Sequence, residues 1–204
     1  MNKNRNLIIE GRKKGEAILL RGDYVRMKIW SALVATPHPV QTLDLIPQTN
    51  CSYNQVKSWL DAWSLHGFVT KEALGKSPTG GKRFVFSAIN KTELPPSIDL
   101  KGRDKPVEHR QYIWEAIRDI SSEYTHFKPS CILERVDEKH SIDISHVYAI
   151  SYLRSLYHAH YLACEYDDYD RDPIYSLNYN TGPFAPSVRR GKAIFDPNLG
   201  VMVS

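Results

Sequence analysis

The stretch "WLDAWSLHGFV", from Trp59 to Val69, predicts a helix that ends at a glycine and is followed directly by a strand. Val56, Leu60 and Trp63 lie four and three residues apart, which is the spacing of one face of a helix. Gly67 suits the left-handed backbone conformation that commonly ends a helix. The chain continues as "FVTKEAL", "GKSPTGGK" and "RFVFSAI", the pattern of a strand, a turn and a returning strand. We therefore expect a helix, a stop and a hairpin in immediate succession.

Two helices are predicted before this one. The apolar residues of "MKIWSALV" have the spacing of an amphipathic helix, which "TPHPV" ends. "VQTLDLI" predicts a short second helix, and "PQTNCS" is a turn that offers Asn50 or Ser52 as an N-cap. The third helix then runs over about residues 52–66.

A similar pattern returns in the second half of the chain. "QYIWEAI" (111–117) matches "MKIWSAL" (27–33) at an offset of 84 residues, and "YLRSLYHAHYL" (152–162) matches the stretch from Trp59 to Val69 at an offset of 93. The difference indicates a nine-residue insertion in the second copy. We predict a structural repeat of two units.

The order of helix, helix, tight turn, helix and hairpin resembles the winged helix-turn-helix DNA-binding superfamily. The resemblance is carried by the helix that ends in "LHGFV" and by the hairpin "TGGKRFVF". It covers about residues 24–90 and, with fewer shared features, about 108–181. It implies an α+β, mainly helical fold of two tandem winged-helix units, each with three helices and a β-hairpin wing.

Five segments are expected on this basis. Residues 1–22 form a basic arm or hairpin, 23–90 and 107–181 are the two winged-helix units, and 182–204 are an extended tail. Residues 91–106 are predicted to be a linker, because "LPPSIDLKGRDKP" combines prolines, a glycine and charges.

The charge of the chain is uneven along its length. Residues 1–100 carry 14 Lys and Arg against 8 Asp and Glu, whereas residues 101–204 carry 13 against 15. The first half is therefore +6 and the second half −2, so the basic character behind the net charge of +4 belongs to the first half, which favours an anionic partner there. No run of 18 apolar residues predicts a membrane span. Three separated cysteines and an N-terminal apolar run of only three residues favour a cytoplasmic protein, nucleoid-associated in a prokaryote.

The resemblance implies that the third helix and the wing of the first unit contact double-stranded DNA. Asn and Gln side chains suit adenine in the major groove, and Lys and Arg suit phosphate or guanine. The ordinary alternative is a solvated helix face and a polar turn, but the repeat order and the charge asymmetry favour DNA. The candidate residues are Ser52, Tyr53, Asn54, Gln55, Lys57 and Ser58 on the helix, Lys76, Lys82 and Arg83 on the wing, Arg12, Lys13 and Lys14 on the arm, and Arg189 and Arg190 on the tail.

The second copy differs at the matching positions. Val147, Tyr148 and Ile150 stand where the first copy has Asn54, Gln55 and Lys57, and its wing turn "CEYDDYDRDP" is acidic. An acidic turn repels phosphate, so this copy is expected to read DNA poorly. Its apolar helix suits self-association or a protein partner, unless the first copy or the tail covers it.

We therefore expect a non-enzymatic, sequence-specific DNA-binding protein that regulates transcription. We expect it to assemble as a homodimer through the second unit and the tail. Alternatives are a replication initiator of a plasmid or mobile element, and a winged-helix module that binds a protein partner without DNA. His158, His160 and Cys164 lack a fourth metal ligand, and no common nucleotide-binding or catalytic motif is present, so neither metal nor cofactor is expected.

Overall fold

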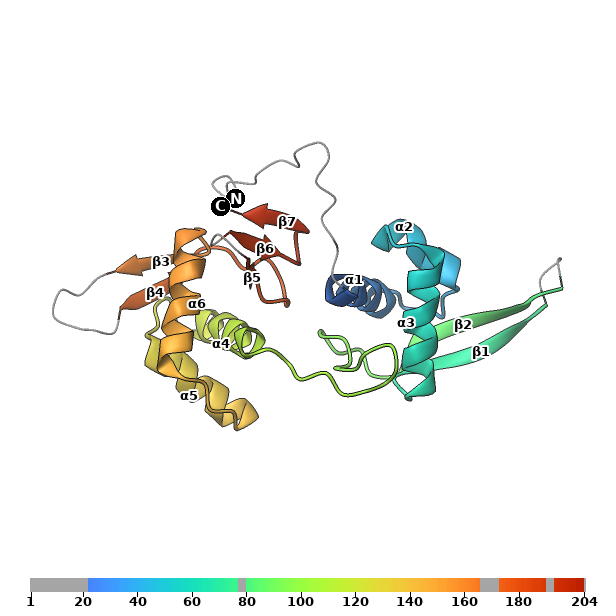
Figure 1. The fold of residues 1–204 in the computed structure, drawn as a ribbon, viewed down its shortest axis with the longest axis horizontal. Helices are drawn as coiled ribbons and strands as arrows, with labels where there is room; N and C mark the ends of the chain where they lie inside the picture. Colours follow the sequence, from blue (N-terminus) through green and yellow to red (C-terminus); the bar gives the residue numbers. More distant parts are fainter. Residues whose placement is uncertain (1–21, 77–79, 166–172, 190–192, 204) are drawn as a thin grey trace. The chain divides into compact units, whose positions relative to one another are not determined.

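The computed structural model describes residues 22–76, 80–165, 173–189 and 193–203. The chain divides into two compact units, one of Ala17–Pro106 and one that includes Val107–Ser204. They are called here the N-terminal unit and the C-terminal unit. Over the described residues the fold is α+β, with six α-helices and small antiparallel sheets (Figure 1). No helix in these ranges is long and apolar enough to cross a membrane.

The N-terminal unit packs its helices around one apolar core. Its elements are α1 (Gly22–Ala35), the 3₁₀ helix η2 (Thr42–Leu45), α2 (Ile46–Thr49), α3 (Tyr53–Leu65), β1 (Val69–Lys76) and β2 (Lys82–Ala88). β1 and β2 form an antiparallel hairpin, and Val40 adds a bridge to Phe86 of β2. The predicted order of helices and hairpin is therefore present, with the second helix reduced to η2 and α2.

Local sequence explains where α3 begins and ends. Ser52 caps its first turn by accepting a hydrogen bond from the backbone N–H of Gln55 at 3.3 Å, as an N-cap residue does. Gly67 adopts φ 77° after the helix, a conformation that glycine tolerates without steric cost. The backbone N–H of Phe68 then donates to the carbonyl of Trp63 at 2.9 Å and leads the chain into β1.

Three tryptophans occupy the centre of the N-terminal unit. Trp63 meets Trp30 edge to face, with ring centroids 5.1 Å apart, and lies 5.4 Å from Trp59. Trp59 is only 7% exposed, so its position at the edge of the helix face still belongs to the core. Ring pairs at these separations add directional contact to the apolar area that they bury.

The stretch 91–106, which the sequence predicts as a linker, packs in part on the N-terminal unit. Ile98 is buried in its core. The indole N–H of Trp30 donates to the carbonyl of Thr92 at 2.9 Å, and the Arg26 guanidinium donates to the carbonyl of Ile98 at 3.2 Å. A Cβ on Gly102 would come within 1.8 Å of the His66 ring, so this loop also lies directly against the end of α3.

The C-terminal unit has the same order of elements. It contains α4 (His109–Glu123), α5 (Pro129–His140), α6 (His146–His158), β3 (Leu162–Glu165) and β4 (Ile174–Leu177). β3 and β4 are antiparallel, and Phe127 bridges to Tyr175 of β4 as Val40 bridges to Phe86. Ser145 caps α6, and His160 takes the left-handed conformation at φ 63°, at the position that Gly67 has in the N-terminal unit.

The tail forms a part of the C-terminal unit. β5 (Ser187–Val188), β6 (Ile194–Asp196) and β7 (Val201–Val203) make a three-stranded antiparallel sheet in that order. The indole N–H of Trp114 donates to the carbonyl of Gly182 at 2.9 Å. Ala185, Ile194 and Val203 are buried in the same core as α4 and α6. The tail therefore adds buried apolar surface to this unit. The sequence had left open whether the tail packs on its own unit or on a partner protomer.

Candidate nucleic-acid interface

The polar residues predicted on the third helix all lie at the surface. Ser52 and the five candidates on α3, namely Tyr53, Asn54, Gln55, Lys57 and Ser58, are exposed, whereas Val56 between them and Leu60 after them are buried. This division follows from the helical period, because residues three and four apart share a face. The start of α3 therefore presents a polar surface to solvent.

Two of these residues are engaged within the helix cap. The Ser52 backbone N–H donates to Gln55 Oε1 at 2.9 Å, and the Ser52 hydroxyl lies 3.1 Å from the same oxygen. Bidentate pairing with adenine needs both the oxygen and the nitrogen of an amide. Gln55 would have to leave the cap to read a base. Asn54, the residue before it, is not part of the capping box. Sequence reasoning treated the two amides as equivalent and missed this difference.

Lys57 is held by an acidic neighbour that the sequence analysis did not single out. Its ammonium group is paired with Asp61 one turn further along α3, and Lys71 of β1 donates to the other oxygen of Asp61 at 2.6 Å. The hydrogen bond to Asp61 raises the pKa of Lys57. Partial burial alone would raise the pKa of Asp61, but the hydrogen bonds from the two lysines outweigh it and the net shift is downward. The spacing of Lys57 and Asp61 on one helix was the signal that would have found the first pair.

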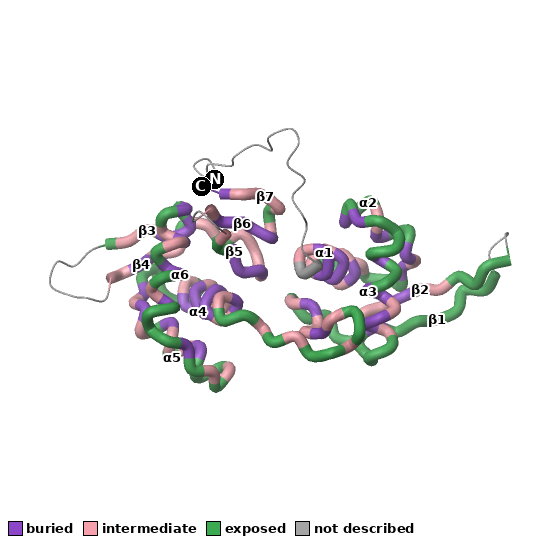
Figure 2. Tube along the Cα trace, viewed as in Figure 1, coloured by how far each residue is buried: buried purple, intermediate pink, exposed green. Residues whose placement is uncertain are grey.

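The hairpin of the N-terminal unit carries basic side chains at its outer end. Lys76 pairs across the strands with Lys82, and Gly75 faces Arg83 after a register shift that begins at Ala73. Both lysines and Arg83 are exposed, and the outer part of the hairpin is exposed throughout its described length (Figure 2). Like charges directly opposite each other destabilise a strand pair, so this arrangement favours a bound anion.

The remaining candidates lie outside the described part of the N-terminal unit. Arg12, Lys13, Lys14 and Arg190 lie outside the described residues. Arg189 belongs to the C-terminal unit, where its guanidinium lies 5.2 Å from the centre of the Phe195 ring. The surface that the structure assembles from the predicted set is therefore α3 together with the hairpin β1–β2.

The matching surface of the C-terminal unit exposes an apolar and an aromatic side chain among polar ones. Val147 is 79% exposed and Tyr148 is 41% exposed at the start of α6, so the tail does not cover them. Tyr148 meets the His109 ring edge to face at 5.7 Å. Of the coverings that the sequence analysis considered, the first copy or the tail, the described part of the tail does not bury these two residues.

A charged seam between α4 and α5 was not found from the sequence. Arg135 lies within 3.6 Å of Asp119 and 3.3 Å of Glu123 on α4, and 3.8 Å from Glu138. Hydrogen bonding to Glu123 raises the pKa of Arg135. The four-residue spacing of Glu115, Asp119 and Glu123 is the pattern that would have predicted an acidic stripe.

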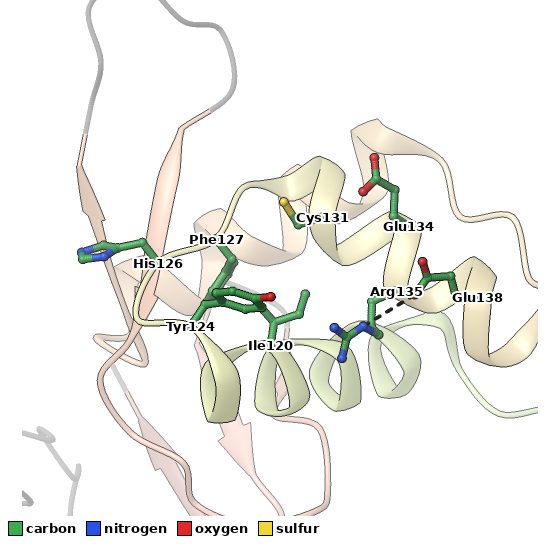
Figure 3. A pocket seen from close by; sticks show the side chains of 8 residues that line it. All are labelled: Ile120, Tyr124, His126, Phe127, Cys131, Glu134, Arg135 and Glu138. Carbon is green, nitrogen blue, oxygen red and sulfur yellow. Dashed lines mark ion pairs between the residues drawn. The ribbon is translucent and has the colours of Figure 1, made fainter.

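Beside this seam lies a pocket of about 340 Å³ (Figure 3). Ile120 and Phe127 supply its apolar side, and Arg135 and Glu138 form an ion pair on the opposite side. Because the carboxylates on α4 and α5 already surround Arg135, the pocket offers no excess positive charge to an anion. Among the residues described in the structure, no group of three or more His, Cys, Asp or Glu side chains could hold a metal ion.

Comparison with known proteins adds no family to this geometry. None of the protein-family models matches the chain, and no curated protein matches its sequence.

Proposed function

We propose that the chain is a sequence-specific double-stranded DNA-binding protein that regulates transcription, and that it does so with two tandem winged-helix units. The observation that carries the proposal is the joint surface of α3 and the β1–β2 hairpin. There Tyr53, Asn54 and Ser58 are exposed on the helix, beside a hairpin with exposed Lys76, Lys82 and Arg83. A helix of this kind fits the major groove, and basic residues on a hairpin fit the phosphates beside it.

The difference between the units supports a division of roles. The start of α6 presents Val147 and Tyr148 at the positions of Asn54 and Gln55, and so lacks the two amide side chains that suit adenine. We assign DNA reading to the N-terminal unit, and assembly into a homodimer to the C-terminal unit with its tail. Two reading helices related by a dimer axis would then meet half-sites one helical turn of DNA apart.

A salt titration tests the electrostatic part of the proposal. Fluorescence anisotropy with the full chain should show tight binding to a duplex selected from random DNA. The logarithm of the affinity should fall linearly with the logarithm of salt concentration, because bound phosphates release their counterions. No binding to any selected duplex at low salt would end the proposal.

Substitutions separate base reading from phosphate binding. Asn54→Ala should weaken binding to the selected duplex by about 1–3 kcal/mol and relax its sequence preference, as the loss of one bidentate base contact does. Lys82→Ala should weaken binding to selected and scrambled duplexes alike. Lys101→Ala is the matched control, because it removes an exposed lysine that lies on neither α3 nor the hairpin.

A protein-interaction module without DNA binding is the second candidate. The observation that favours it is the start of α6, where Val147 (79% exposed) and Tyr148 (41% exposed) are neighbouring exposed side chains. Val147→Ser with Tyr148→Ser distinguishes the two functions. If the double variant no longer dimerises but each protomer still binds DNA, the DNA-binding function is supported. If neither the wild-type chain nor the variant binds DNA, the protein-interaction module is the function that remains.

A further inference from the structure

One carboxylate lies in the middle of the basic surface of the N-terminal unit. Asp61 of α3 accepts a hydrogen bond from Lys71 of β1 at 2.6 Å through Oδ1, and Lys57 is paired with Oδ2. Lys71 also lies 4.5 Å from the centre of the Phe84 ring and 5.7 Å from that of Phe86. The Lys71 ammonium is therefore fixed between a carboxylate and two aromatic faces.

This arrangement links the helix to the hairpin. Lys57 comes from α3, Lys71 comes from β1, and both meet at Asp61, so one carboxylate sets where the two ammonium groups lie. Each ammonium has three donors and uses one of them on Asp61, which leaves donors for another acceptor. At the same time the carboxylate cancels one of the two positive charges and lowers the attraction for any phosphate nearby.

The C-terminal unit shows that the fold does not need this group. At the offset of 93 residues that relates α3 to α6, Lys57 corresponds to Ile150 and Asp61 to Arg154. Lys71 corresponds at the same offset to Cys164. The second helix–hairpin junction forms with none of the three charges in place, so the function of Asp61 belongs to the surface of the N-terminal unit.

We propose that Asp61 is a positioning residue that makes DNA binding selective, because it holds Lys57 and Lys71 at one place and reduces their attraction for phosphate in general. This inference rests on the proposed function of the N-terminal unit. A duplex whose backbone fits that place gains both lysines in a fixed arrangement. A duplex that does not fit meets a surface whose positive charge is partly cancelled, so binding to unrelated DNA is weakened more than binding to the fitted site.

The test uses full-length variants and two probes, a duplex selected from random DNA by the wild-type chain and a scrambled duplex of equal length. Asp61→Asn should raise affinity for the scrambled duplex by about threefold to fivefold, the size expected for a surface charge pair. Affinity for the selected duplex should rise less, so the ratio of the two affinities falls. Asp61→Glu keeps the carboxylate and should restore most of the ratio.

Glu72→Gln is the matched control, because it removes one exposed carboxylate from β1, the strand that carries Lys71. It should raise both affinities by the same factor and leave their ratio unchanged. If Asp61→Asn also leaves the ratio unchanged, Asp61 contributes only charge and the inference is wrong. If the wild-type chain binds no duplex at all, the proposed function fails first, and this result is distinct because it appears before any variant is compared.

Discussion

The two units share one backbone frame but close it in different ways. Phe68 of the N-terminal unit and Tyr161 of the C-terminal unit occupy equivalent positions, yet Phe68 is 36% exposed and Tyr161 is fully buried. The Tyr161 hydroxyl donates to Asp196 of the tail at 2.6 Å. The same order of helices and strands therefore leaves the residue before the first strand partly exposed in the N-terminal unit and buries it in the C-terminal unit, where the tail packs on it.

The shared frame is visible in the hydrogen bonds at the base of each hairpin. The backbone N–H of Phe68 donates to the carbonyl of Trp63 at 2.9 Å, and the backbone N–H of Tyr161 donates to the carbonyl of Leu156 at 2.9 Å. The carbonyls of Phe68 and Tyr161 then accept from Ile89 at 3.0 Å and from Asn178 at 2.8 Å. The same helix-to-strand turn therefore forms with glycine in one unit and with a left-handed histidine in the other.

The largest expected effect comes from removing the shared core residue of α3 and α6. Leu60 and Leu153 are both fully buried, so Leu60→Ala and Leu153→Ala should each destabilise their own unit by about 2–5 kcal/mol. Urea unfolding measured by tryptophan fluorescence and by far-ultraviolet circular dichroism checks this, because three of the four tryptophans lie in the N-terminal unit. Leu65→Ala, at an 81% exposed position, is the control and should stay within about 0.5 kcal/mol of wild type. A small cost for only one of the core variants would break the equivalence of the two helices.

The next effect tests how the C-terminal unit is closed. Tyr161→Phe removes the hydroxyl that donates to the fully buried Asp196 carboxylate and should cost about 1–3 kcal/mol, because a buried acceptor loses its partner. Phe68→Tyr places the same hydroxyl at the half-exposed position of the N-terminal unit and should be neutral within about 0.5 kcal/mol. Thermal unfolding of both variants measures the contrast. Equal costs would mean that the tail does not account for the difference between the units.

Local patterns predicted a large part of this frame. The spacing of Val56, Leu60 and Trp63 predicted α3, and Gly67 predicted its end. Both predictions are confirmed by the helix Tyr53–Leu65 and by the left-handed glycine. The α+β class and the two hairpins followed from the same kind of signal, since residues close in sequence decide helical and strand periods. The winged-helix assignment and the DNA-binding residues stay predictions.

Contacts between distant residues could not be predicted in this way. Gly182 and Pro183 bond to α4 residues about seventy positions earlier, and the Gly- and Pro-rich tail has no periodic pattern to reveal this. The capping role of Gln55 was missed for a different reason. An amide side chain suits base reading and helix capping equally, and the sequence alone does not show that Gln55 accepts a hydrogen bond from Ser52.

Helix capping gives a smaller contrast. Ser52 caps α3 together with the Gln55 side chain, whereas Ser145 caps α6 by accepting from Tyr148 alone at 3.3 Å. Ser52→Ala should cost about 1–2 kcal/mol and Ser145→Ala about 1 kcal/mol, because the first change removes two hydrogen bonds of the Ser52 hydroxyl with Gln55 and the second removes one. Urea unfolding of the two variants compares them directly. A Gln55→Ala variant that is as stable as wild type would contradict the capping role and return Gln55 to the base-reading residues.

The smallest expected effect is the pH dependence that Asp61 gives to the N-terminal unit alone. Because its pKa is lowered in the folded chain, the stabilisation from its lysine pairs is fully present above the pKa of an unfolded Asp, near 3.9, and is lost as pH falls through the lower folded value. Exposed ion pairs contribute a few tenths to about 1 kcal/mol, which bounds the effect. Between about pH 5 and pH 2 the N-terminal unit should therefore lose stability more steeply in wild type than in Asp61→Asn, whereas above about pH 6 the slopes should agree. Tryptophan fluorescence during urea unfolding at each pH measures this, and the C-terminal unit, with Arg154 at the matching position, serves as the internal control. An altered pH slope in the C-terminal unit of the same variant would show that the effect does not come from the Lys57–Asp61–Lys71 group.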